Sequence, residues 1–264
     1  MSIRELVKSR VSEEGRQEIR RAINTIKWPI SKTLGLWRRR GYEARLPFTG
    51  GRRWSSDIPF DLHHTIQEGT IAYTYRDVPC LKHPMDFALY THLVWEVKPR
   101  SIIEIGSKAG GSALWFSDMQ RNYGIDGRIL SIDIAPPTPP YQRPEIEFVR
   151  GDANNLGESV SEERLTALPR PWLVIEDASH HYAATLAVLR FFGPHMRRGE
   201  YLVVEDGNVS DMGDDQARAG GPLRAISQYL METPGRFEID AAYCDRYGHN
   251  VTGNPNGYLR CLAD

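Results

Sequence analysis

The stretch Ser101-Ile-Ile-Glu-Ile-Gly-Ser-Lys-Ala-Gly-Gly-Ser-Ala-Leu-Trp-Phe116 decides the fold of this chain. It begins with a β-branched run, which is typical of a strand covered on both faces. Gly106, Gly110 and Gly111 follow, and glycine permits a tight turn and the close approach of a ligand to the backbone. Ser112 can cap the helix that the spacing predicts next. This order predicts a cofactor site at the carboxyl end of a parallel sheet.

The glycine spacing differs from the dinucleotide fingerprint G-x-G-x-x-G, which disfavours a nicotinamide cofactor. An acidic residue, Glu104, stands two residues before the first glycine. A carboxylate at this place suits S-adenosylmethionine (SAM), because that ligand carries a positive amino group and no pyrophosphate. We therefore expect the turn to bind SAM through Glu104, Gly106, Ser107, Gly110 and Ser112. An ordinary turn between a strand and a helix is the alternative.

Four more apolar runs with the character of buried strands lie at 128–133, 146–149, 172–175 and 201–204. Helical patterns are found at 85–97, 112–121, 158–168, 181–192 and 222–232. Two final strands, near 236–242 and 256–262, have no clear helix between them and are expected to add an antiparallel edge. The alternation predicts an α/β fold with a seven-stranded, mostly parallel sheet and helices on both faces, the Rossmann-like plan of class I methyltransferases.

The N-terminal part of the chain differs from the rest in charge. Residues 1–45 hold 12 Lys and Arg against 5 Glu, with apolar residues at helical spacing. We expect residues 1–60 to form a basic helical extension and residues 61–264 the methyltransferase domain. One-sided helices need a partner surface, which suggests a homo-oligomer, although a solvated arm is the alternative. Residues 54–84 look irregular, either as a lid over the site or as packing across the sheet edge.

The overall composition excludes several classes of protein. Hydrophobic residues make up 41 % and charged residues 25 %, and the formal net charge of −1 argues against general nucleic-acid binding. No apolar run approaches the roughly 18 residues that a transmembrane helix needs, and no signal-peptide pattern is present. Cys80, Cys244 and Cys261 suggest neither a disulfide framework nor a zinc site. We therefore expect a cytoplasmic protein.

Carboxylates follow the predicted strands one after another, at Asp133, Asp152, Asp177, Glu205 and Asp206. The carboxyl ends of parallel strands share one edge of the sheet, where ligands bind. Asp133 lies about where an acid hydrogen-bonds the ribose hydroxyls of a bound nucleotide. Asp152 and Ala153 could reach the adenine of the same ligand. The alternative for each Asp is a structural role in a turn.

Asp177, Glu205 and Asp206 follow two neighbouring strands, and three hard oxygen ligands suit Mg²⁺ or Mn²⁺. The alternative is that these acids only cap the helices that follow. His180 comes three residues after Asp177. In the first turn of the next helix, its neutral imidazole would be placed to take a proton from a substrate hydroxyl. His181 competes for this role, because adjacent residues at a helix start point about 100° apart.

Three segments in order carry a family resemblance: Glu-Ile-Gly-Ser-Lys-Ala-Gly-Gly-Ser (104–112), Ile-Glu-Asp-Ala-Ser-His (175–180) and Val-Val-Glu-Asp-Gly (203–207). Together they resemble the cephalosporin-hydroxylase/rhamnosyl O-methyltransferase family, and the chain is also similar to Mg²⁺-dependent macrolide-sugar O-methyltransferases. The resemblance covers roughly residues 65–262. It implies SAM as methyl donor and a sugar or natural-product hydroxyl as acceptor. It also implies that Asp177, Glu205 and Asp206 bind the metal and that His180 is the general base.

The expected function is therefore a SAM- and divalent-metal-dependent O-methyltransferase that acts on a hydroxyl of a sugar or glycoside. The acceptor would be a small molecule or an oligosaccharide. Weaker candidates for acceptor-binding residues are Tyr75, Arg76, His181, His249 and Asn254. Two rival functions stay open at this point. One is a catechol-type O-methyltransferase, whose site would need apolar walls for an aromatic diol, and the other is a non-catalytic SAM-binding partner protein.

Overall fold

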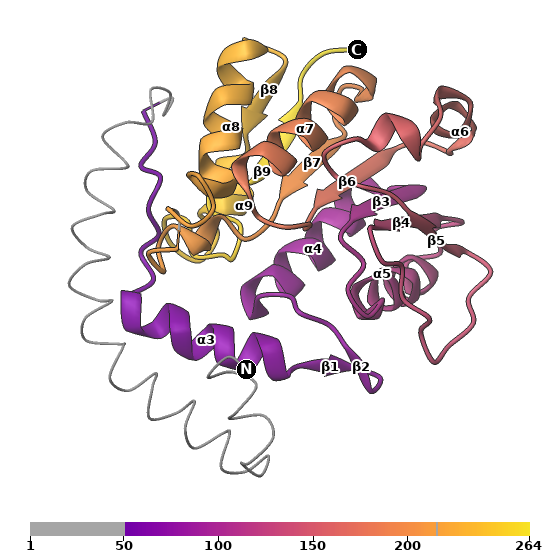
Figure 1. Cartoon of the computed structure of the whole chain (residues 1–264), viewed down its shortest axis with the longest axis horizontal. Coiled ribbons are helices and arrows are strands. Elements are labelled where there is room, and N and C mark those ends of the chain that lie inside the picture. The colour runs from indigo at the N-terminus through magenta and orange to yellow at the C-terminus, as the bar shows by residue number, and fades with distance from the viewer. Residues whose placement is uncertain (1–50, 215) are drawn as a thin grey trace, which may run out of the picture.

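The computed structural model describes residues 51–214 and 216–264 (Figure 1). Most of the predicted basic extension, and with it the one-sided helices behind the expected homo-oligomer, lies outside the described residues. Residues 52–58, which are described, pack against the loop 245–257. The Arg52 guanidinium lies 2.7 Å from the Asp245 carboxylate, and the hydroxyl of Ser56 donates to the carbonyl of Asn250.

A seven-stranded sheet forms the centre of the molecule, in the order β5-β4-β3-β6-β7-β9-β8. The strands are β3 (Ser101–Ile105), β4 (Arg128–Asp133), β5 (Ile146–Arg150), β6 (Trp172–Glu176), β7 (Tyr201–Val204), β8 (Phe237–Ile239) and β9 (Tyr258–Cys261). Neighbours from β5 to β7 pair in parallel. Strand β9 is antiparallel to both β7 and β8. The predicted α/β fold with an antiparallel edge is confirmed.

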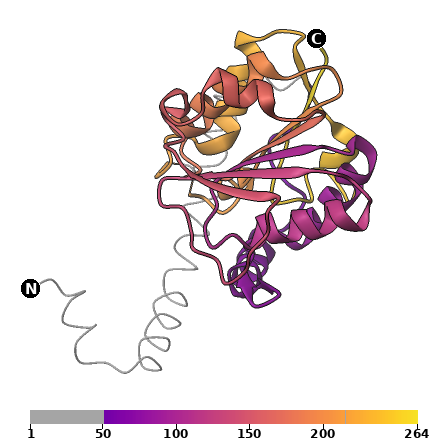
Figure 2. The ribbon, with the colours of Figure 1, turned by 90° about the vertical axis from the view of Figure 1, so that its right-hand side faces the viewer.

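Helices cover both faces of the sheet, which Figure 2 shows between two helical layers. They are α4 (Pro84–Val97), α5 (Gly111–Asn122), α6 (Glu162–Ala167), α7 (Tyr182–Phe192), α8 (Gly221–Glu232) and α9 (Ala241–Cys244). Side chains alternate along a strand, so each strand supplies both cores. In β3, Ile103 and Ile105 join the core that includes residues of α7 and α8, and Ile102 joins the core that includes residues of α4 and α5.

Two stretches differ from the sequence-based prediction. Residues 54–84, expected to be irregular, hold helix α3 (Phe60–Ala72) and a small hairpin of β1 (Thr74–Tyr75) and β2 (Val78–Pro79). Helix α3 escaped prediction because it buries only His63 and Thr70 and so has no apolar stripe. The helix predicted over 158–168 is shorter, since a 3₁₀ turn, Leu156–Glu158, precedes α6.

None of the helices in the described part of the chain is both long and apolar enough to span a bilayer. The strands from β5 to β7 run parallel, so their carboxyl ends lie at one edge of the sheet (Figure 1). This edge is the place where an open α/β sheet binds its ligands.

Candidate active site

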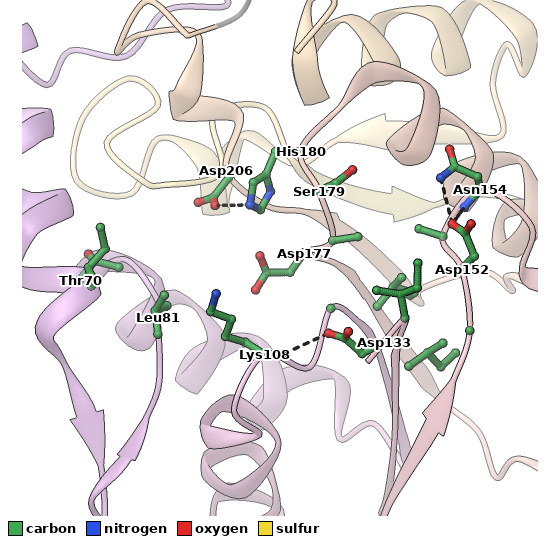
Figure 3. A pocket seen from close by; sticks show the side chains of 18 of the residues that line it. Thr70, Leu81, Lys108, Asp133, Asp152, Asn154, Asp177, Ser179, His180 and Asp206 are labelled. Atoms are coloured by element: carbon green, nitrogen blue, oxygen red, sulfur yellow. Dashed lines mark hydrogen bonds and ion pairs between the residues drawn. The ribbon is translucent and has the colours of Figure 1, made fainter. Parts of the chain in front are cut away.

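A cavity of about 520 Å³ opens at the carboxyl ends of β3, β4, β6 and β7 (Figure 3). The side chains and backbone after these strands form one wall, and Gln67, Thr70 and Ile71 of α3 contribute to the lining as well. Of the residues predicted from the sequence, the following line it: Gly106, Asp133, Asp152, Ala153, Asp177, His180 and Asp206. The cavity therefore brings part of the expected SAM site and part of the expected metal site into one space.

The glycine turn after β3 is fixed by its neighbours. Gly106 has φ +107°, and a Cβ atom there would lie 2.0 Å from the carbonyl oxygen of Asp177. Only glycine fits this position, since both the backbone conformation and the space exclude a side chain. The Asp133 carboxylate accepts hydrogen bonds from the backbone N–H of Ser107 at 2.8 Å and of Lys108 at 3.2 Å. Asp133 thus holds the turn in place at the same time as it faces the cavity.

The far end of the cavity combines a carboxylate with an apolar surface. Asp152 follows β5, and its Oδ1 accepts from the backbone N–H of Asn154 at 2.9 Å. Its Oδ1 also accepts from the side-chain amide of Asn154, and the two hydrogen bonds lower the pKa of Asp152, so the carboxylate stays ionised. Ile134 lines the same cavity and is 64 % exposed. An exposed apolar side chain beside two acids suits a ligand with a flat ring and hydroxyl groups.

Four of the predicted SAM-binding residues lie outside the lining of this cavity: Glu104, Ser107, Gly110 and Ser112. Glu104 is fully buried, and the Ser131 hydroxyl donates to its Oε2 at 2.7 Å. The Ser107 hydroxyl pairs with that of Ser131 at 2.7 Å. The carbonyl of Gly110 accepts from the Tyr141 hydroxyl at 2.6 Å.

Asp177, His180 and Asp206 form the candidate metal centre. Each offers one ligand atom, and these three atoms lie within 4.8 Å of one another. His180 Nε2 is 3.2 Å from Asp206 Oδ2 (Figure 3). His180 and Asp206 both hold left-handed backbone conformations, with φ of 56° and 55°. Such conformations are strained for residues other than glycine and cluster at functional sites.

Glu205, the third predicted metal ligand, belongs to a different group of side chains. Its Oε2 lies 2.9 Å from Lys82 Nζ, and its Oε1 accepts from the Tyr90 hydroxyl at 2.5 Å. Lys82 Nζ also donates to Asp177 Oδ2 at 2.6 Å and lies 3.8 Å from Glu104 Oε1. The structure thus brings Asp177 and Asp206 together as expected, adds His180 to them, and links Glu205 to the site through Lys82.

Burial and charge act against each other in this group. Burial raises the pKa of Asp177 to about 7 and that of Glu205 to about 8, although Lys82 counteracts part of the shift. Burial also disfavours the charged form of Lys82, but Asp177, Glu205 and Glu104 together raise its pKa well above the usual value. Lys82 is therefore an ammonium ion at any physiological pH.

The structure separates the two adjacent histidines. Helix α7 begins at Tyr182, with His181 as the residue before it, so His180 does not lie in the first helical turn as predicted. His180 lines the cavity and holds a left-handed backbone conformation. His181 is exposed and is not part of the cavity lining.

The remaining candidates for the acceptor site lie mostly away from the cavity. Tyr75 and Arg76 both bind Asp118 of α5, at 3.1 and 2.8 Å. His249 Nε2 lies 2.9 Å from the carbonyl of Arg53. Only Asn254 touches the centre, through a hydrogen bond from the backbone N–H of Asp206 at 3.2 Å.

Sequence reasoning missed Lys82 and the contribution of α3. Lys82 is one of several polar residues between β2 and α4, and nothing in its neighbourhood shows that it reaches carboxylates about a hundred residues away. Gln67, Thr70 and Ile71 were missed together with their helix.

The family model and the relatives that match this sequence carry the same name. The sequence model of a family described as "Rhamnosyl O-methyltransferase/CmcI" matches residues 68–262. A protein named rhamnosyl O-methyltransferase from Mycobacterium leprae is 32 % identical over 189 residues, 70 % of this chain and 82 % of that protein. One of the same name from Mycobacterium bovis is 29 % identical over 211 residues, 77 % of this chain and 85 % of that protein.

Solved structures agree with these sequence relatives. An apo structure of CmcI superposes with a TM-score of 0.59 at 26 % identity, covering 74 % of this chain and 78 % of that one. A structure of CmcI described as bound to Mg and SAM gives a TM-score of 0.56 at 26 % identity, covering 73 % of this chain and 78 % of that one. The structural likeness therefore extends over about three quarters of this chain.

Proposed function

Because this chain belongs to the rhamnosyl O-methyltransferase/CmcI family of O-methyltransferases, we propose that it transfers a methyl group from SAM to a hydroxyl of a sugar or glycoside, with the help of a divalent cation. One observation carries the proposal. Asp177, His180 and Asp206 line the same cavity as Gly106, Asp133 and Asp152, so a donor and a cation would meet in a single space.

The donor set suits a magnesium or manganese ion. The carboxylates of Asp177 and Asp206 converge beside the imidazole of His180, and water or acceptor oxygens would complete an octahedron around an ion held by the two acids. His180 Nδ1 is buried without a hydrogen-bond partner in the described part of the chain, so the ring has capacity for a further interaction. Magnesium and SAM are described together in a structure of CmcI, which supports the assignment. A bound ion would lower the pKa of the acceptor hydroxyl as a Lewis acid.

The other end of the cavity suits SAM. Asp133 keeps oxygen lone pairs for the ribose hydroxyls beside its bonds to the glycine turn, and Ile134 offers an apolar face for the adenine. Asp152 and Ala153 border the same face. Gly106, in the tight turn after β3, lines the same cavity. SAM supplies the electrophilic methyl group, and the protein supplies orientation and charge.

His180 is the residue that we propose as the general base, as the sequence predicted. Its imidazole would take the proton of the acceptor hydroxyl, and bound SAM would supply the methyl group to that oxygen, with the carbon–sulfur bond electrons left on the sulfur of the demethylated product. Asp206, 3.2 Å from Nε2, stabilises the imidazolium that forms. His180→Ala should therefore abolish turnover while the affinity for Mn²⁺ falls little. A large loss of Mn²⁺ affinity would instead make His180 a metal ligand.

The proposed acceptor class is tested with a panel of hydroxyl compounds. The chain is incubated with SAM and Mg²⁺ and either a deoxysugar and mannose-type glycan panel or a catechol panel, and products are followed by mass spectrometry. We expect the mass gain of one methyl group on a member of the sugar panel. Methylation confined to catechols would replace the sugar by an aromatic diol, and turnover of neither panel would contradict the proposal.

A further inference from the structure

A buried ammonium ion lies at the meeting point of three strands. Lys82 stands between β2 and α4, and only 1 % of its side chain is exposed. Its Nζ lies 2.6 Å from Asp177 Oδ2, 2.9 Å from Glu205 Oε2 and 3.8 Å from Glu104 Oε1. These carboxylates stand at the ends of β6, β7 and β3, which are neighbours in the sheet. One cation thus holds three acids that would otherwise repel each other.

The same acids border the candidate metal centre. Asp177 belongs to both groups, because it pairs with Lys82 and also lies within 4.8 Å of His180 and Asp206. Glu205 directly precedes Asp206 in the chain, and both its oxygens already accept hydrogen bonds, from Lys82 and Tyr90. A divalent ion bound to Asp177 would lie close to a fixed positive charge. Like charges in a buried, low-dielectric place repel strongly.

We propose that Lys82 is an internal counter-cation of the metal site, whose ammonium competes with the divalent ion for Asp177. Without the ion, Lys82 keeps the carboxylates together and the site assembled. With the ion, the repulsion from Lys82 lowers the affinity and keeps binding reversible. The inference rests on the proposed function only in that a divalent ion binds at this centre.

The experiment compares three substitutions by calorimetric titration of Mn²⁺ into the full chain, without SAM or acceptor. Lys82→Met removes the charge and keeps the length of the side chain. Lys82→Arg keeps the charge, and Lys98→Met removes an exposed lysine at the far end of α4 as a matched control. We expect Lys82→Met to bind Mn²⁺ at least about tenfold more tightly, equal to about 1.4 kcal/mol. Lys82→Arg and Lys98→Met should stay within about threefold of the unchanged chain.

A second measurement, the melting temperature with and without Mn²⁺, keeps the test decisive if Lys82→Met is less stable than the unchanged chain. Lys82→Met leaves three carboxylates without their counter-ion, so its melting temperature in metal-free buffer should fall. Saturating Mn²⁺ should then raise its melting temperature by more than it raises that of the unchanged chain, because tighter binding to the native state stabilises it more.

The outcomes separate the inference from the proposed function. If the unchanged chain binds Mn²⁺ and Lys82→Met binds it equally or more weakly, the counter-cation role is wrong while the metal site stands. An equal gain of affinity in Lys98→Met would trace the effect to net charge and also overturn the role. Binding by neither the unchanged chain nor Lys82→Met would overturn both the role and the metal-dependent function.

Discussion

Asn254 Oδ1 accepts a hydrogen bond from the backbone N–H of Asp206 at 3.2 Å. Asn254 is 1 % exposed and lies in the loop that leads into β9, so its side chain is fixed by its surroundings. Asp206 holds a left-handed backbone with φ 55°. The amide of Asn254 therefore supports a strained residue of the candidate metal centre, which is a different role from the acceptor binding that the sequence suggested.

Asn254→Ala should weaken the metal centre. The change leaves the N–H of Asp206 without its partner, which we expect to lower the free energy of unfolding by about 1–3 kcal/mol. The affinity for Mn²⁺ should fall as well, because Asp206 is then free to leave its strained conformation. Thermal unfolding and calorimetry measure the two effects. Unchanged Mn²⁺ affinity would show that Asp206 is held by other contacts.

Asp177→Asn should separate chemistry from donor binding. The amide has the shape of the carboxylate but lacks its charge. The divalent ion therefore loses an anionic ligand, and the ammonium of Lys82 loses the charged partner of its hydrogen bond. We expect kcat to fall by at least about a hundredfold and the Kd for SAM to stay within about threefold. Asp126→Asn, at a fully exposed position, is the control. An equal loss of SAM affinity would place Asp177 in the donor site.

Removal of divalent ions should stop methyl transfer. Excess EDTA is expected to abolish turnover, and Mg²⁺ or Mn²⁺ in excess over the chelator should restore it, because the acceptor hydroxyl loses the Lewis acid that lowers its pKa. Product formation by mass spectrometry is the measurement. Full turnover in EDTA would remove the ion from the mechanism.

Asp86 gives a prediction for stability against pH. The carboxylate accepts hydrogen bonds from Thr252, Gly253 and Tyr258, but burial raises its pKa from 3.8 to about 7. A pKa raised by folding means that the native state binds the proton more tightly. This contribution to stability is present below the unfolded pKa and is lost as the pH rises through the folded pKa.

Asp86→Asn should therefore change the pH profile of unfolding in one direction. Between about pH 4 and 7, the free energy of unfolding of the unchanged chain should fall relative to the variant by up to about 1.4 kcal/mol per pH unit. Denaturant unfolding of both chains across this range measures the difference and cancels the other titrating groups. Parallel profiles would show that Asp86 does not titrate in this window.

Gly106→Ala and Gly69→Ala should have opposite effects on stability. At Gly106 the new methyl group would overlap the carbonyl of Asp177, and φ is +107°, so we expect a loss of more than about 3 kcal/mol. Gly69 lies inside α3, and a Cβ there meets no atom within 4 Å. Alanine at this helical position should stabilise the chain by about 0.5–1 kcal/mol. Equal unfolding midpoints would contradict the strain at Gly106.

The sheet was predictable because local signals agreed with the global fold. Strands β3, β6 and β7 are fully buried runs followed by or ending in Gly or an acid, as in Ser101–Ile105 and Trp172–Glu176. Each predicted strand is found within three residues of its expected limits. Helix α3 carried no such signal, since it covers the cavity edge and buries little. Its position depends on tertiary contacts that a periodic pattern does not encode.

The site was predictable in its acids and not in its cation. Strand topology alone brings Asp177 and Asp206 to one edge, so their convergence followed from the sequence. The pairing of Glu205 with Lys82 joins residues that are distant in the chain, and His180 and Asp206 hold left-handed backbone conformations. Neither the left-handed backbone of His180 nor the contact between Lys82 and Glu205 produces a periodic pattern in the sequence.

The position of β9 between β7 and β8 has a consequence for the order in which the chain folds during synthesis. Strand β8 pairs only with β9 in the described sheet, and Asp206 meets Asn254 only when the segment before β9 has docked. Without residues 254–261, β7 and β8 lack the strand that lies between them, and Asp206 lacks its hydrogen bond to Asn254. The candidate metal centre is therefore complete only after the segment before β9 has docked against Asp206.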